Sequence, residues 1–197
     1  MSWTLVGSIY AFATVMSITP GPNNVMLMAS GMAFGFRRTV PLMVGVIVGC
    51  IALILAVAAG VGAIVAALPQ LHIAMKIAGS GYIVWLAWQI WSASGAKTVE
   101  AARPIGLVGG AMFQLVNPKA WIMALSAVSA FTQPGEAYLS SVILLTSLFF
   151  IASLPSITLW TGFGAMIRKL MERPEVLRRV NRCLAVATLL CVVLIWL

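Results

Sequence analysis

The chain has 197 residues, of which 62% are hydrophobic and only 8% are charged, and its mean hydropathy is +1.07. Soluble domains of ordinary composition do not carry so many apolar residues, so the composition indicates a membrane protein. The net charge of +8 does not indicate nucleic-acid binding, because the basic residues lie in short gaps between apolar segments.

Six apolar segments predict an all-α integral membrane protein with six transmembrane helices and no separate soluble domain. Each segment is long enough to cross a hydrocarbon core of about 30 Å. The first is too long for the apolar region of a cleavable signal peptide, so we expect no such peptide. The predicted spans cover residues 4–32, 40–67, 71–92, 107–131, 138–166 and 181–197.

The first predicted span is interrupted by the sequence Thr19-Pro-Gly-Pro-Asn-Asn24. Proline lacks a backbone N–H and clashes with the preceding turn, so a helix break is expected here. In a bilayer, the freed backbone groups must be satisfied by protein or by a water-filled cavity. A helix that starts after the break would offer free N–H groups to a carboxylate. The motif predicts a substrate-binding segment; the alternative is a structural kink whose amides bond the freed backbone. The residues concerned are Pro20, Gly21, Pro22, Asn23 and Asn24.

The fourth predicted span contains a second set of candidate residues. Lys119 is the only charged residue deep in a span, about 18 Å along the helix from its start. A lysine at the centre of a membrane helix costs about 3 kcal/mol and usually faces a cavity or a partner. Gln114, Asn117 and Trp121 are spaced to share one helical face. We therefore predict that Gln114, Asn117, Pro118 and Lys119 also bind substrate; the alternative is that Lys119 bonds carbonyls released by Pro118.

The two halves of the chain, about residues 1–98 and 99–197, each contain a proline that interrupts the first span. A shift of 98 residues places Asn117-Pro118 on Thr19-Pro20. Three spans is an odd number, so a duplication would give halves of opposite orientation. We expect one transporter domain made of two inverted three-helix repeats, with interrupted helices one and four meeting near the middle of the membrane. The pairs Gly31/Gly35 and Gly45/Gly49 are spaced for close helix packing, and a homo-oligomer is left open.

The basic residues predict the orientation. Ten of them follow spans one, three and five, whereas only Lys76 lies on the opposite side. Cytoplasmic loops carry the excess of Lys and Arg, so both termini are predicted on the outer, periplasmic side. The ten residues are Arg37, Arg38, Lys97, Arg103, Arg168, Lys169, Arg173, Arg178, Arg179 and Arg182.

No carboxylate lies in any predicted span, because all four glutamates are in loops. A cationic substrate would have no acidic partner, so the lining favours neutral amino acids. Cys50, Cys183 and Cys191 lack metal or redox spacing and are interpreted as buried apolar residues. We expect no metal and no cofactor.

The segment Ser17-Ile-Thr-Pro-Gly-Pro-Asn-Asn24, followed by Ala33-Phe-Gly-Phe-Arg-Arg38, resembles the N-terminal signature of the LysE/RhtB amino-acid exporter family. Gly81-Tyr-Ile-Val-Trp-Leu-Ala-Trp88 and Gln114-Leu-Val-Asn-Pro-Lys119 are similar to further family segments. The chain is most similar to the cysteine/O-acetylserine exporter branch. The resemblance implies a multi-pass protein of the bacterial inner membrane that exports amino acids or their derivatives, driven by the proton gradient. Its motifs do not separate the substrates of family members, which include lysine, threonine, homoserine, leucine and cysteine.

Two other functions are compatible with a membrane protein of this length. A non-transporting scaffold or sensor subunit has little need for a disrupted span and a deep lysine. A membrane-embedded hydrolase needs a nucleophile and a base in one cavity, whereas the single histidine, His72, lies at the outer edge of a span. The expected partners are therefore a small amino-acid substrate and the lipid bilayer.

Overall fold

A computed structural model describes residues 2–63, 69–92, 104–170 and 174–196. In these ranges every regular element is a helix and no strand is present, which confirms the predicted all-α class. The longer helices are rich in Leu, Val, Ile and Ala, which bury apolar surface without leaving backbone groups unpaired. The helices are α1 (Trp3–Ile18), α2 (Pro22–Phe34), α3 (Phe36–Ala58), α5 (Pro69–Ser92), α7 (Leu107–Val116), α8 (Pro118–Phe131), α9 (Tyr138–Leu170) and α10 (Pro174–Trp196), with a short 3₁₀ helix at Gly135–Ala137.

Both predicted helix interruptions are confirmed. Helix α1 ends at Ile18 and α2 begins at Pro22, and the two axes are bent by 55°. Helix α7 ends at Val116, and Asn117 takes an extended conformation (φ −88°, ψ 105°) before α8 begins. The extended conformation follows from Pro118, because a proline disfavours helical geometry in the residue before it.

Several predicted boundaries are wrong. The second span ends at Ala58, before the turn at Gly60, rather than at residue 67, and residues 64–67 lie outside the described part of the chain. Helix α10 begins at Pro174 rather than at residue 181, so Arg179 and Arg182 lie on a helix and not in a loop. Of the other predicted loop residues, 97, 103 and 173 lie outside the described ranges.

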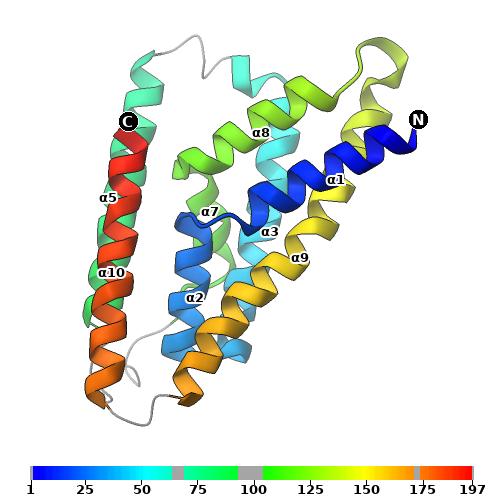
Figure 1. Cartoon of the computed structure of the whole chain (residues 1–197). Coiled ribbons are helices and arrows are strands. Elements are labelled where there is room, and N and C mark those ends of the chain that lie inside the picture. The colour runs from blue at the N-terminus through cyan, green and yellow to red at the C-terminus, as the bar shows by residue number, and fades with distance from the viewer. Residues whose placement is uncertain (1, 64–68, 93–103, 171–173, 197) are drawn as a thin grey trace.

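The helices alternate in direction through the molecule. In Figure 1, α1 and α2 run downward, α3 runs upward and α5 runs downward, and the second half then repeats the series in the opposite sense. Helix α1 begins and α10 ends at the same, upper end of the view. Among the described residues, two single helical stretches, Phe36–Ala58 and Gly135–Lys169, are long and apolar enough to cross a membrane, and the bent pair α1–α2 makes a third. That α5, α7–α8 and α10 also cross the membrane stays a prediction.

The helix pairings agree with a duplicated three-helix unit. Helices α1 and α2 pack on α9, α7 and α8 pack on α3, and α5 packs on α10. Exchanging the first three spans for the last three leaves this set of pairings unchanged. Together with the opposite chain directions, this is the arrangement that an inverted repeat predicts.

Glycines bring the main helix pairs into close contact. A side chain at Gly31 or Gly164 would collide with the backbone of the facing helix in the α2–α9 pair, and one at Gly45 or Gly49 would do so in the α3–α7 pair. The predicted packing role of Gly31, Gly45 and Gly49 is therefore confirmed within the chain. Gly35 has a different role: its φ of 83° permits the sharp turn between α2 and α3.

Candidate functional site

The break between α1 and α2 leaves carbonyl groups at the end of α1 without helical donors, and an amide and an ammonium side chain supply donors to them. The side-chain amide of Asn24 donates to the carbonyl oxygens of Ser17 and Thr19, at 2.8 and 2.9 Å. The ammonium of Lys119 donates to the carbonyl oxygens of Thr19 (2.7 Å) and Pro20 (3.4 Å). A cation at the C-terminal end of α1 also interacts favourably with the helix dipole. Lys119 therefore bonds carbonyls released by the first break.

Helix α9 supplies two further donors to the same helix end. The hydroxyl of Ser156 donates to the carbonyl of Ser17 at 2.7 Å, and the indole N–H of Trp160 donates to the carbonyl of Ile18 at 3.2 Å. Neither contact was predicted, because nothing in the sequence shows that residues 139 and 142 positions apart are neighbours. The broken end of α1 is thus held by three other helical segments.

Gly21 makes room for the lysine. A Cβ atom at this position would lie 2.8 Å from Cδ and 3.2 Å from Nζ of Lys119. The backbone of Gly21 is extended (φ −177°, ψ 178°), so its requirement for glycine comes from this steric contact and not from backbone strain. A larger residue would displace the flexible end of the Lys119 side chain.

A reciprocal amide pair joins the two halves of the molecule. Asn23 on α2 donates to Oε1 of Gln114 on α7 at 2.9 Å, and Gln114 donates back to Oδ1 of Asn23 at 3.0 Å. Gln114 also donates to the carbonyl of Gly110, and the thiol of Cys50 lies 3.4 Å from its Oε1. Gln114 is completely buried, so the pair satisfies polar groups that would otherwise be costly.

The predicted common face of Gln114, Asn117 and Trp121 is not present, because the break separates α7 from α8. Asn117 instead caps α8, and its Oδ1 accepts a hydrogen bond of 3.2 Å from the backbone N–H of Lys119. Trp121 folds back, and its indole N–H donates to the carbonyl of Leu115 at 2.8 Å, near the end of α7. Asn117, which lies between the two helices, therefore caps the start of α8, and Trp121 on α8 bonds a carbonyl near the end of α7.

A small cavity lies where the two breaks meet. Five of the nine predicted site residues line it: Gly21, Asn23, Asn24, Asn117 and Lys119. Pro20, Pro22 and Pro118 shape the breaks without lining the cavity, and Gln114 lies behind Asn23. The cavity measures about 50 Å³, whereas one water needs about 10–15 Å³ on this scale. It therefore has room for only a few waters.

The other residues that line the cavity were not among the predicted substrate-binding residues. Ser17 and Ser153 face each other across the cavity with their hydroxyl oxygens 3.4 Å apart. Cys50, interpreted from the sequence as an inert buried residue, lines the cavity beside them, and Cys183 is exposed rather than buried. The apolar part of the lining comes from Met16, Val46, Ile47, Ala120, Met123 and Ile157.

The electrostatics of the cavity favour an anion on one side. Helices α2 and α8 both begin at its wall, so their N-terminal ends direct partial positive charge toward it. No side chain caps α2, which leaves the N–H groups of Asn23 and Asn24 without acceptors in their own helix. The ammonium of Lys119 adds a full positive charge. None of the described residues that line the cavity carries a carboxylate.

Comparison with known proteins shows the family to which the chain belongs. The family model described as "LysE type translocator" matches residues 14–196. The chain belongs to the LysE type translocator family. It is 27% identical over 197 residues, the full length of both chains, to cysteine/O-acetylserine efflux proteins of Escherichia coli strain K12, Escherichia coli O139:H28 (strain E24377A / ETEC) and Shigella sonnei strain Ss046. No solved structure matches the chain.

Membership of the LysE type translocators makes this protein a membrane transporter and not an enzyme. The match begins within α1 and continues to the end of α10, so it includes both helix breaks and every residue that lines the cavity. The hydrolase alternative is thereby excluded.

Proposed function

We propose that this chain exports small neutral amino acids or their derivatives from the cytoplasm, with cysteine, O-acetylserine, homoserine and threonine as the first candidates. The observation that carries the proposal is the cavity between two broken helices, where two helix N-terminal ends and one ammonium group converge. Its full-length relatives named as cysteine/O-acetylserine efflux proteins support the substrate class.

The proposed site binds the two ends of a zwitterion differently. The substrate carboxylate would meet Lys119 and the free N–H groups at the start of α2, the arrangement found where anions bind helix N-terminal ends. The substrate ammonium would meet carbonyl oxygens near the end of α1, beside Ser17. Neutral side chains are favoured because the described lining has no acidic group to offset a second positive charge.

In the proposed transport cycle the cavity must open, because its present volume admits only a few waters. The two halves, about residues 1–98 and 99–197, would rock about the contacts between Asn23 and Gln114 and between Lys119 and the α1 carbonyls. A carboxylate that binds Lys119 would replace its bonds to these carbonyls, and binding would thereby loosen the link between the halves. Coupling to the proton gradient is part of the proposal and rests on the family resemblance.

The proposed orientation places both termini outside the cytoplasm. Arg37, Arg38, Arg168 and Lys169 all lie at the end of the molecule opposite to the start of α1 and the end of α10, as the excess of basic residues in cytoplasmic loops requires. Alkaline phosphatase fused after Trp196 should be active in the periplasm. An active cytoplasmic reporter at the same position would contradict this orientation.

Efflux measured in intact bacteria tests the function directly. Cells overproducing the protein would be preloaded with dipeptides that release single amino acids, and the released amino acids would be quantified in the medium. Faster release of cysteine, threonine or homoserine than from cells carrying Lys119→Gln protein at equal membrane abundance is the expected result. Selective release of lysine or arginine would contradict the neutral-substrate assignment. No release from protein present in the membrane would favour a scaffold or sensor subunit.

A further inference from the structure

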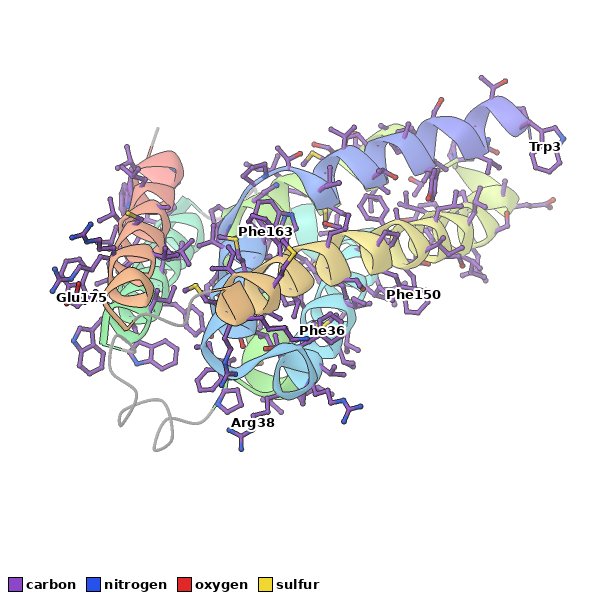
Figure 2. The ribbon with its side chains drawn as sticks, turned by 60° about the horizontal axis from the view of Figure 1, so that its bottom comes forward. Trp3, Phe36, Arg38, Phe150, Phe163 and Glu175 are labelled. Atoms are coloured by element: carbon purple, nitrogen blue, oxygen red, sulfur yellow. The ribbon has the colours of Figure 1, made fainter. Side chains whose placement is uncertain are left out.

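A second hollow lies far from the central cavity, at the end of the molecule where the basic residues gather. It is a groove of about 890 Å³ between the turn that joins α2 to α3 and the last turns of α9. Figure 2 shows this end of the molecule, with Phe36 beside α9 and Arg38 also at the start of α3. The transport site does not use this groove.

The groove concentrates positive charge. Arg37, Arg38, Arg168 and Lys169 line it, and none of its described lining residues is acidic. Helix α3 adds the partial positive charge of its N-terminal end, which has neither a side-chain cap nor an acidic residue in its first turn. Arginines at a helix N-terminal end are electrostatically unfavourable, so a bound anion would relieve the repulsion. Arg168 reaches the turn itself, since its Nη1 lies 3.2 Å from where a Cβ of Gly35 would be.

An apolar stripe on α9 leads away from the groove. Leu159, Phe163 and Met166 are spaced four and three residues apart, so they lie on one face of α9. Their side chains are 59%, 51% and 50% exposed, and Met166 also lines the groove. Helix α9 is one of the two helices that are long and apolar enough to cross a membrane, as counted over the described residues. The stripe therefore offers a surface for an acyl chain directly beside the cationic groove.

We propose that the groove binds the phosphate head group of an anionic phospholipid, with an acyl chain of that lipid along the Leu159–Phe163–Met166 stripe. Basic pockets between transmembrane helices at the cytoplasmic end are suited to such head groups. The arginines can each donate two parallel hydrogen bonds to a phosphate. The stripe distinguishes a lipid from a free anion, because a soluble phosphate would gain nothing from it. The proposal depends on membrane embedding and not on the substrate assignment.

Native mass spectrometry of the full chain, purified in detergent and delipidated, tests the proposal. Phosphatidylglycerol, phosphatidylethanolamine and inorganic phosphate would each be titrated onto the protein. Two variants address the groove. Arg38→Gln removes one of its four basic side chains, and Gly162→Leu fills the groove while keeping all four basic side chains. Gly162 lines the groove, and a Cβ there would meet no atom within 4 Å. Arg179→Gln is the matched control, because Arg179 is an exposed arginine on α10 outside the groove.

Phosphatidylglycerol is expected to bind more tightly than phosphatidylethanolamine, and Arg38→Gln should weaken its binding about fivefold, the usual effect of one basic residue. Gly162→Leu should weaken it as well, and Arg179→Gln should leave it unchanged. Equal weakening by Arg179→Gln would show diffuse attraction, and no preference for phosphatidylglycerol would show that the basic residues do not select the lipid; either result would overturn the site. Inorganic phosphate that binds as tightly, with the same dependence on Arg38, would overturn the lipid assignment. If Gly162→Leu does not fold, the comparison of phosphatidylglycerol binding by Arg38→Gln and by Arg179→Gln tests the site without it.

Discussion

Lys119 provides the sharpest test of the transport site, because its ammonium has two separable roles. It closes the end of α1 through the carbonyl of Thr19, at 2.7 Å, and in the proposed function it also binds the substrate carboxylate. A charged donor is required for the second role, whereas a neutral donor can partly serve the first. Three variants separate the roles: Lys119→Arg keeps charge and donors, Lys119→Gln keeps only a neutral donor, and Lys119→Met keeps neither.

The expected magnitudes follow from the bonds. Exchanging a charged hydrogen bond for a neutral one costs about 1 kcal/mol, so Lys119→Gln should lower Tm by about 2–4 °C in a chain of this size. Lys119→Met should lower Tm further, because it leaves the carbonyl of Thr19 without this donor. Loss of the carboxylate contact, worth about 1.5–3 kcal/mol, should reduce substrate affinity about 10- to 150-fold in both neutral variants.

The assay is uptake of radiolabelled threonine or O-acetylserine into proteoliposomes by counterflow, at matched protein density, together with thermal unfolding of the same preparations. If Lys119→Arg transports substrate and both neutral variants are equally impaired, transport depends on the positive charge at this position. That result would support the binding role. Transport by Lys119→Gln at the wild-type rate would refute it, because the ammonium would then be needed only to close α1.

Three further predictions concern the scaffold of the site. Gly21→Ala should fold with a Tm within about 3 °C of wild type, since only the flexible end of Lys119 must move, yet it should slow counterflow severely; normal counterflow would show that the lysine position is unimportant. Asn24→Ala leaves two carbonyls at the end of α1 without their amide donor and should lower the unfolding free energy by about 1–3 kcal/mol, measured by thermal unfolding against the wild type. Gly45→Val should reduce the amount of folded protein sharply in a fluorescence size-exclusion assay, because its side chain meets the backbone of α7, whereas Gly162→Val meets open space and should be tolerated.

The sequence by itself determined the class of the protein and the places where its helices break. The apolar composition required membrane helices, because only closed backbone hydrogen bonding is tolerated in lipid. Pro20, Pro22 and Pro118 required interruptions, because proline cannot continue the helical hydrogen-bond ladder. The residues proposed for substrate binding were found for the same reason: amides and a lysine beside such breaks are costly unless they have partners.

Only the tertiary structure decided which partners those are. Lys119 was predicted to bind substrate, with bonding to carbonyls released by Pro118 as the alternative; in the structure its ammonium crosses to the other half and bonds the carbonyls of Thr19 and Pro20 at the end of α1. Ser156 and Trp160 on α9 reach the same helix end, and Asn23 pairs with Gln114 across the two halves. Helical periodicity describes neighbours within one continuous helix, so it placed Gln114 and Trp121 together wrongly. Contacts between distant segments depend on how the helices pack, and that is set by close approaches at glycines spread over the whole chain.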